Sequence, residues 1–91
     1  MTADEMATAI QRECEGLKAF LLKKQAAYGN SAADPVRIFS RSGATEQLNV
    51  RIDDKLSRIS RGQEHPGDNT ELDLIGYLIL RRILAVRELT K

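Results

Sequence analysis

Residues 70–89 constrain the fold most strongly, because apolar side chains cover most of the circumference of the helix that they predict. These side chains are Leu72, Leu74, Ile75, Tyr77, Leu78, Ile79, Leu80, Ile83 and Leu84. A helix that is apolar on all sides has to be buried on all sides. A chain of 91 residues offers few other elements to cover it. We therefore expect a homo-oligomer, with contact between copies through residues 70–89.

Two further segments show the apolar spacing of amphipathic helices. In residues 4–27 the periodic side chains are Met6, Ile10, Leu17 and Leu21. In residues 44–61 they are Leu48, Ile52, Leu56 and Ile59. Gly29 and Gly62 follow these segments as helix stops.

Helix-start signals complete the pattern. Asp34 followed by Pro35 predicts a short helix over residues 36–39. Asp68 and Asn69 are alternative N-caps for the last helix. The fold class is therefore all-α: a single domain over residues 1–91 with three longer helices and one short helix, completed by homo-oligomerisation.

Composition excludes several functional classes. The 14 Lys and Arg residues balance 13 Asp and Glu residues, and a net charge of +1 argues against binding long nucleic acids. One Cys excludes a disulfide framework and a multi-Cys zinc site, and favours a reducing compartment. No apolar run has the length of a membrane span, and the polar start is unlike a signal peptide. We expect a cytoplasmic protein without membrane contact.

Basic side chains lie beside the apolar stripe of the 44–61 helix. Arg51, Lys55 and Arg58 share one helical face. They could form a wall of a phosphate pocket, because guanidinium groups match phosphate oxygens. In the alternative reading this face is solvated, and its long side chains cover the edge of the core.

Acidic residues allow a second kind of site. Asp54 and Asp73 come from two different helices, and such pairs bind divalent metals in helical bundles. In the alternative reading Asp53, next to Asp54, is an exposed charge. Asp73 is then a first-turn acid that favours the helix dipole, or it pairs with a cation of the 44–61 helix. Tyr77 lies one turn after Asp73. No residue is predicted to be catalytic, and Mg²⁺ is expected only if the protein is a hydrolase.

The segment after the first helix combines an aromatic ring with amide and hydroxyl groups. Tyr28, Asn30 and Ser31 could stack on a base and bond to its edge. In the alternative reading they form only a helix end with a packed ring. Arg37 could add a cation to the same pocket, or it could be solvated.

Taken together, three short motifs resemble the phage and prophage family called nucleotide modification associated domain 1. The motifs are Tyr28-Gly29-Asn30-Ser31, Arg51-Ile52-x-Asp54-Lys55-x-x-Arg58 and Asp73-Leu74-x-x-Tyr77. The resemblance spans residues 20–84 and implies an association with nucleotide chemistry in a phage-infected or lysogenic bacterial host.

A more distant similarity is to the all-α MazG-like nucleoside triphosphate pyrophosphohydrolases, which bind Mg²⁺ through two pairs of acids. At the corresponding places this chain has Arg51-x-x-Asp54 and Thr70-x-x-Asp73, so each pair keeps only its second acid. Cations in place of a metal cage suit holding a nucleotide rather than cleaving it.

The leading hypothesis is therefore a protein that sequesters a cyclic or ADP-ribose-type signalling nucleotide of antiphage defence. The alternatives are a Mg²⁺-dependent pyrophosphohydrolase and a helical protein-interaction module. The expected ligand-binding residues are Tyr28, Asn30, Ser31, Arg37, Arg51, Asp54, Lys55, Arg58, Asp73 and Tyr77.

Overall fold

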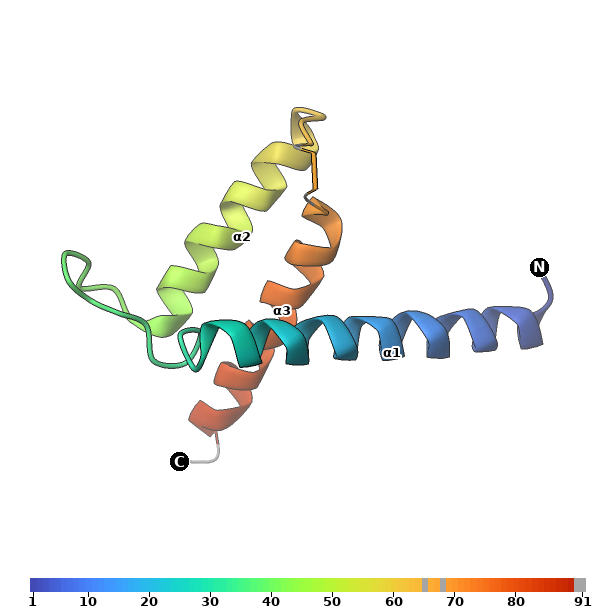
Figure 1. The fold of residues 1–91 in the computed structure, drawn as a ribbon, viewed down its shortest axis with the longest axis horizontal. Coiled ribbons are helices and arrows are strands. Elements are labelled where there is room, and N and C mark those ends of the chain that lie inside the picture. Colours follow the sequence, from blue (N-terminus) through green and yellow to red (C-terminus); the bar gives the residue numbers. More distant parts are fainter. Residues whose placement is uncertain (65, 68, 90–91) are drawn as a thin grey trace.

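A computed structural model describes residues 1–64, 66–67 and 69–89 of the chain. It contains α1 (Ala3–Tyr28), α2 (Ala44–Ser60) and α3 (Thr70–Leu89), as Figure 1 shows. No strand occurs among the described residues. The predicted all-α bundle is confirmed. None of the helices in these ranges has the length and apolarity needed to cross a membrane.

The helix ends follow their local signals. The Thr2 hydroxyl accepts a 3.1 Å hydrogen bond from the backbone N–H of Glu5 at the start of α1. Gly29 and Gly62 follow α1 and α2 with φ of 65° and 64°, a region that favours glycine. Of the two predicted caps of α3, Asn69 accepts from the backbone N–H of Leu72 at 3.0 Å, and Asp68 lies outside the described residues.

The short helix predicted over residues 36–39 is not formed, and that prediction was wrong. One isolated turn makes too few hydrogen bonds to offset the cost of helix nucleation. The loop makes local bonds instead. The Ser42 carbonyl accepts from Arg37 Nε at 3.1 Å and from Gln47 Nε2 at 2.9 Å, and Pro35 is buried.

The three helices pack unequally. Helices α2 and α3 form an antiparallel hairpin, whereas α1 crosses α3 with its C-terminal half (Figure 1). At the crossing, Gly76 of α3 is buried, and a Cβ atom there would lie 2.9 Å from Leu21 Cδ2. The absence of a side chain at Gly76 therefore lets α1 approach α3 closely.

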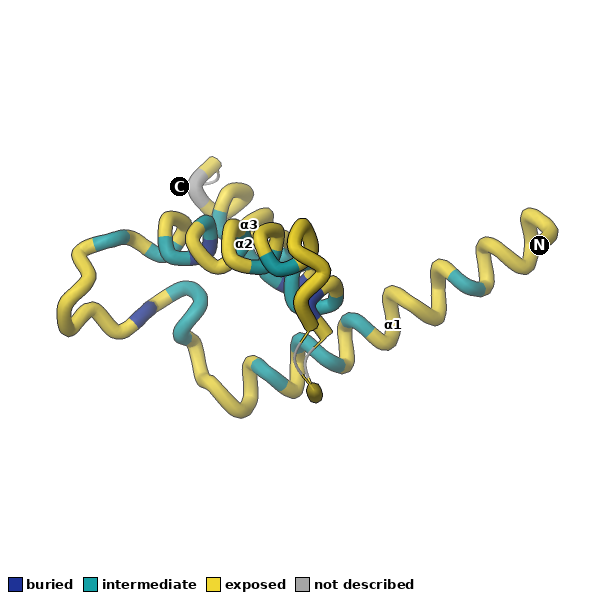
Figure 2. The backbone as a smooth tube through the Cα atoms, turned by 90° about the horizontal axis from the view of Figure 1, so that it is seen from above, coloured by how far each residue is buried: buried dark blue, intermediate teal, exposed yellow. Residues whose placement is uncertain are grey.

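The N-terminal half of α1 extends away from the other helices as a free arm (Figure 2). The Cα radius of gyration is accordingly 15.3 Å, against about 12 Å for a compact domain of this length. Ile75, Leu78 and Ile83 of α3 are 39%, 48% and 56% exposed. One copy of the chain thus leaves much of its most apolar helix uncovered.

The core is correspondingly small, and Leu48 of α2 is its buried hydrophobic anchor at 1% exposure. Replacing Leu48 by Ala should lower the free energy of unfolding by about 2–5 kcal/mol, because the change leaves a cavity. The matched control is Val50→Ala on the same helix, where the side chain is 54% exposed. Urea unfolding at one fixed protein concentration measures both changes. Equal losses for the two variants would contradict the assigned core.

Candidate functional site

A cavity of about 810 Å³ lies between the C-terminal half of α1, the turn that follows it, and α3. Most of its lining is apolar and includes Leu17, Phe20, Leu21, Leu80, Ile83 and Leu84. Its polar lining includes groups on Lys24, Tyr28, Asn30, Arg51, Asp73 and Tyr77. Its size and its mostly apolar lining with a few polar groups are typical of small-molecule sites.

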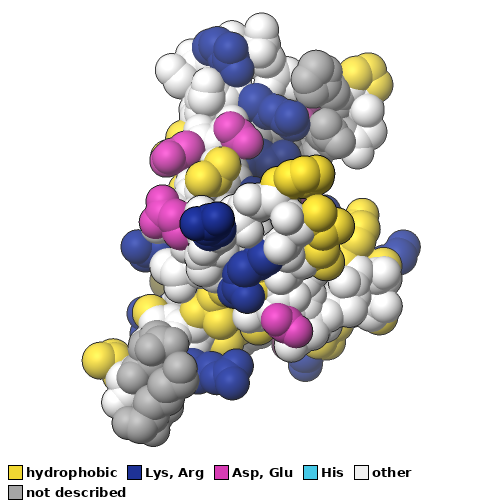
Figure 3. All heavy atoms as spheres, turned by 90° about the vertical axis from the view of Figure 1, so that its left-hand side faces the viewer, with side chains coloured by type: hydrophobic (Ala, Val, Ile, Leu, Met, Phe, Trp, Pro, Cys, Tyr) yellow, Lys and Arg dark blue, Asp and Glu magenta, His cyan; other side chains and the backbone are white. Residues whose placement is uncertain are grey.

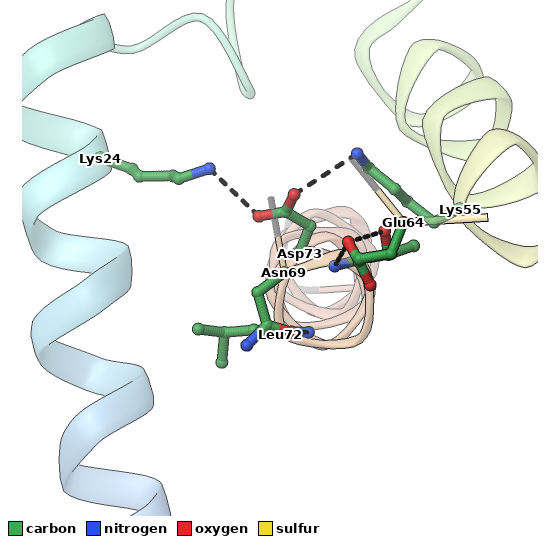
Figure 4. Close-up of polar contacts among 7 residues, drawn as sticks. Lys24, Lys55, Glu64, Asn69, Leu72 and Asp73 are labelled. Atoms are coloured by element: carbon green, nitrogen blue, oxygen red, sulfur yellow. Dashed lines mark hydrogen bonds and ion pairs between the residues drawn. The ribbon is translucent and has the colours of Figure 1, made fainter. Parts of the chain in front are cut away.

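The Asp73 carboxylate is part of the polar lining and pairs with two ammonium groups. Lys24 Nζ of α1 lies 3.2 Å from its Oδ1, and Lys55 Nζ of α2 lies 3.4 Å from its Oδ2. Figure 4 shows the two lysines reaching the carboxylate from opposite sides. The side chains of Asp73 and Lys55 are only 14% and 13% exposed, whereas Lys24 is 43% exposed. One carboxylate therefore links all three helices, and the Lys24 ammonium group also faces solvent.

Two of the cations that line the cavity lie over aromatic rings. The Lys24 ammonium group lies 4.7 Å from the centre of the Phe20 ring. The Arg51 guanidinium carbon lies 5.9 Å from the centre of the Tyr77 ring. Both distances are within the range of cation–π attraction. The rings hold the two cations at the cavity and leave their N–H donors available for an anion.

The turn after α1 contributes a ring and an amide. Tyr28 is 70% exposed and lines the cavity. Asn30 Oδ1 accepts a 3.4 Å bond from Gln25 Nε2, and the Asn30 carbonyl accepts from the backbone N–H of Asp34 at 2.8 Å. These bonds fix the turn and place a flat ring on the open side of the cavity.

Thr70 is the first residue of α3 and bonds to the carboxylate of Glu64. It is 1% exposed, and its hydroxyl donates to Glu64 Oε1 at 2.7 Å while its backbone N–H donates to the same oxygen at 3.1 Å. A carboxylate at this place satisfies a free N–H group and favours the helix dipole. Thr70 thus anchors the start of the helix that carries Asp73.

The residues present do not fit the magnesium cage that the distant similarity implies. Both Asp73 oxygens already face ammonium groups, and Asp54 is exposed on α2 and does not line the cavity. Among the described residues, no group of three His, Cys, Asp or Glu side chains could hold a metal ion.

The structure brings six of the ten predicted ligand-binding residues to the cavity: Tyr28, Asn30, Ser31, Arg51, Asp73 and Tyr77. The other four do not line it. Lys55 pairs with Asp73 from α2, Arg37 bonds within its loop, Arg58 is half-buried on α2, and Asp54 is exposed.

Lys24 was missed as a site residue, although the sequence carries a signal for it. At about 100° per residue, Lys24 falls in the same helical sector as Leu17 and Leu21. A cation in line with an apolar stripe is oriented toward the neighbouring helix, where it needs an anionic partner. That phase argument could have identified Lys24 as a partner for Asp73.

Comparison with protein-family models, curated proteins and solved structures finds no match to this chain. The function therefore has to be argued from the cavity and its side chains.

Asp73 holds the site together, and this can be tested by removing its charge. Asp73→Asn should lower the free energy of unfolding by about 1–3 kcal/mol, because Lys55 is left poorly exposed and without its counter-charge. The loss stays below that for a fully buried pair, since solvent screens Lys24. The matched control is Asp53→Asn, which removes an exposed carboxylate from α2. Equal thermal stability of the two variants would refute the central role of Asp73.

Proposed function

We propose that this protein binds a phosphate-bearing nucleotide in the cavity between α1 and α3 and holds it without cleaving it. One observation carries the proposal: the lining of a cavity of about 810 Å³ combines Lys24 and Arg51 with the rings of Tyr28 and Tyr77. Cations and flat rings together are what phosphate and base require.

Polar side chains of the cavity lining have distinct roles in this proposal. Arg51 and Lys24 bond to phosphate oxygens, and Tyr77 supports the Arg51 guanidinium from its ring face. Tyr28 stacks on the base, and Asn30 bonds to a base edge or a ribose hydroxyl. Asp73 orients Lys24 rather than touching phosphate, because a carboxylate repels an anion.

Holding is favoured over hydrolysis by the charges at the site. Phosphoryl transfer requires stabilisation of developing charge and a positioned nucleophile. Among the described residues that line the cavity, the carboxylate is that of Asp73, and it is paired with two lysines rather than free to act as a general base. We therefore propose sequestration, and the resemblance to phage proteins favours a cyclic or ADP-ribose-type signalling nucleotide as the ligand.

A protein-interaction role is the second candidate, and one observation favours it. In the loop between α1 and α2, Val36, Ile38 and Phe39 are 75%, 78% and 97% exposed. Figure 3 shows hydrophobic side chains exposed among Lys and Arg on one face of the molecule. Contiguous exposed apolar groups mark interaction surfaces.

A thermal-shift screen with and without Mg²⁺ tests the nucleotide proposal. The panel contains nucleoside triphosphates, cyclic dinucleotides and trinucleotides, and cyclic ADP-ribose isomers. A bound ligand stabilises the fold, by about 2.7 kcal/mol at 100 times its dissociation constant. We expect a metal-independent shift with ligand recovered intact. A shift that needs Mg²⁺ and releases pyrophosphate would instead support hydrolysis, and a flat screen would leave the interaction role.

Arg51 provides the sharper test once a ligand is found. Arg51→Ala should weaken binding about tenfold to a hundredfold, because it removes charge-assisted bonds of about 1.5–3 kcal/mol. The matched control is Arg82→Ala, an exposed arginine of α3 that does not line the cavity. Isothermal titration with each variant gives both affinities. Equal affinities would overturn the assignment of Arg51.

A further inference from the structure

The N-terminal half of α1 is amphipathic although it projects away from α2 and α3. At about 100° per residue, Met6 and Ile10 lie in the same sector as Leu17 and Leu21. We call these four residues the α1 stripe. Leu17 and Leu21 line the cavity next to α3, whereas Met6 and Ile10 are 50% and 55% exposed on the free arm.

The opposite sector of the same arm is polar. It carries Asp4, Glu5, Thr8, Gln11, Arg12 and Glu15. A helix that is solvated on all sides gains nothing from such a division, and a short unsupported helix is marginal in water. The division indicates that a second apolar surface covers the α1 stripe.

The exposed surface has the size that a stable partner requires. The chain of 10.2 kDa exposes 7304 Å², whereas a compact monomer of this mass exposes about 5300 Å². The difference, about 2000 Å², exceeds the roughly 800 Å² that each partner buries in a standard interface. The excess is of the size that obligate dimers bury.

The charges of α1 identify the partner. Residues 3–15 carry four acids and one Arg, whereas residues 16–28 carry three lysines and no acid. An antiparallel copy of α1 would place the acidic half of each helix beside the basic half of the other. The acidic arm also argues against an anionic membrane as the occupant, because like charges repel.

We infer that two copies of this chain pair through antiparallel α1 helices about a twofold axis. Met6 and Ile10 of one copy then cover part of the apolar lining of the other copy's cavity, which includes Leu17 and Ile83. The contact is isologous, so the same surface closes both cavities. The contact between copies through residues 70–89, which the sequence predicts, is separate from this pairing. The pairing follows from the apolar stripe and the charges of α1 and does not require that contact.

Light scattering after size exclusion, without any nucleotide, tests the pairing. We expect at least twice the 10.2 kDa chain mass for the wild type. Ile10→Asp should convert it toward the monomer, whereas Thr8→Asp, which adds the same charge to the opposite face, should not. A monomeric wild type at tens of micromolar, or an Ile10→Asp variant that stays paired, would overturn the inference.

A second measurement needs no variant and reports the orientation. Isotope-labelled and unlabelled protein are mixed and treated with a carbodiimide, which joins neighbouring carboxylates and amines. We expect links between the copies from Glu13 of one, which lies beside the α1 stripe, to Lys18 of the other, which lines the cavity. Hydrogen exchange of residues 5–16 should also slow as protein concentration rises. Links between copies confined to other segments, or exchange independent of concentration, would refute the antiparallel pairing.

Discussion

The fold depends on one carboxylate that receives an ammonium group from each neighbouring helix. Asp73 joins α1 through Lys24 and α2 through Lys55. Helix α2 has other contacts with α3, but α1 has few, chiefly the close approach of Leu21 to Gly76. Because α1 forms one wall of the cavity, the pair between Lys24 and Asp73 positions the site as well as the helix.

The same pair explains how a largely apolar cavity can hold the ammonium group of Lys24 in its lining. An isolated ammonium group beside Phe20 and Leu21 would lose hydration without compensation. Asp73 compensates both lysines only in part, since one negative charge faces two positive ones. The surplus is positive, and Arg51, over the ring of Tyr77, adds to it. An anion that enters the cavity would therefore meet a field that is already favourable.

Much of this fold could be predicted from local signals. Gly29 and Gly62 end their helices, and Asn69 caps α3, because each acts within a few residues. The prediction of a short helix at residues 36–39 was wrong for the opposite reason. Its cap signal was local, but the segment bonds beyond it: the Ser42 carbonyl accepts hydrogen bonds from Arg37 and Gln47. Apolar spacing also brought Tyr77 and Asp73 to the correct face of α3.

The place where α1 crosses α3 could not be predicted in this way. Periodicity gives the face that a helix buries, but not the position along its neighbour. Gly76 fixes that position by leaving room for Leu21, and Gly76 had no signal of its own within an apolar helix. For the same reason Lys24 was missed. Lys55 was assigned to phosphate, and the alternative in which a cation of the 44–61 helix pairs with Asp73 is the one that the structure shows.

The small core and the open cavity have a common physical origin. A 26-residue α1 is about 39 Å long, so it extends far beyond the part of α3 that it crosses. The overhang projects away from α2 and α3, yet its apolar stripe continues the lining of the cavity. In the pairing that we infer, covering the overhang of one copy also closes the cavity of the other. Ligand binding and self-association would then stabilise each other, because both favour the same closed arrangement.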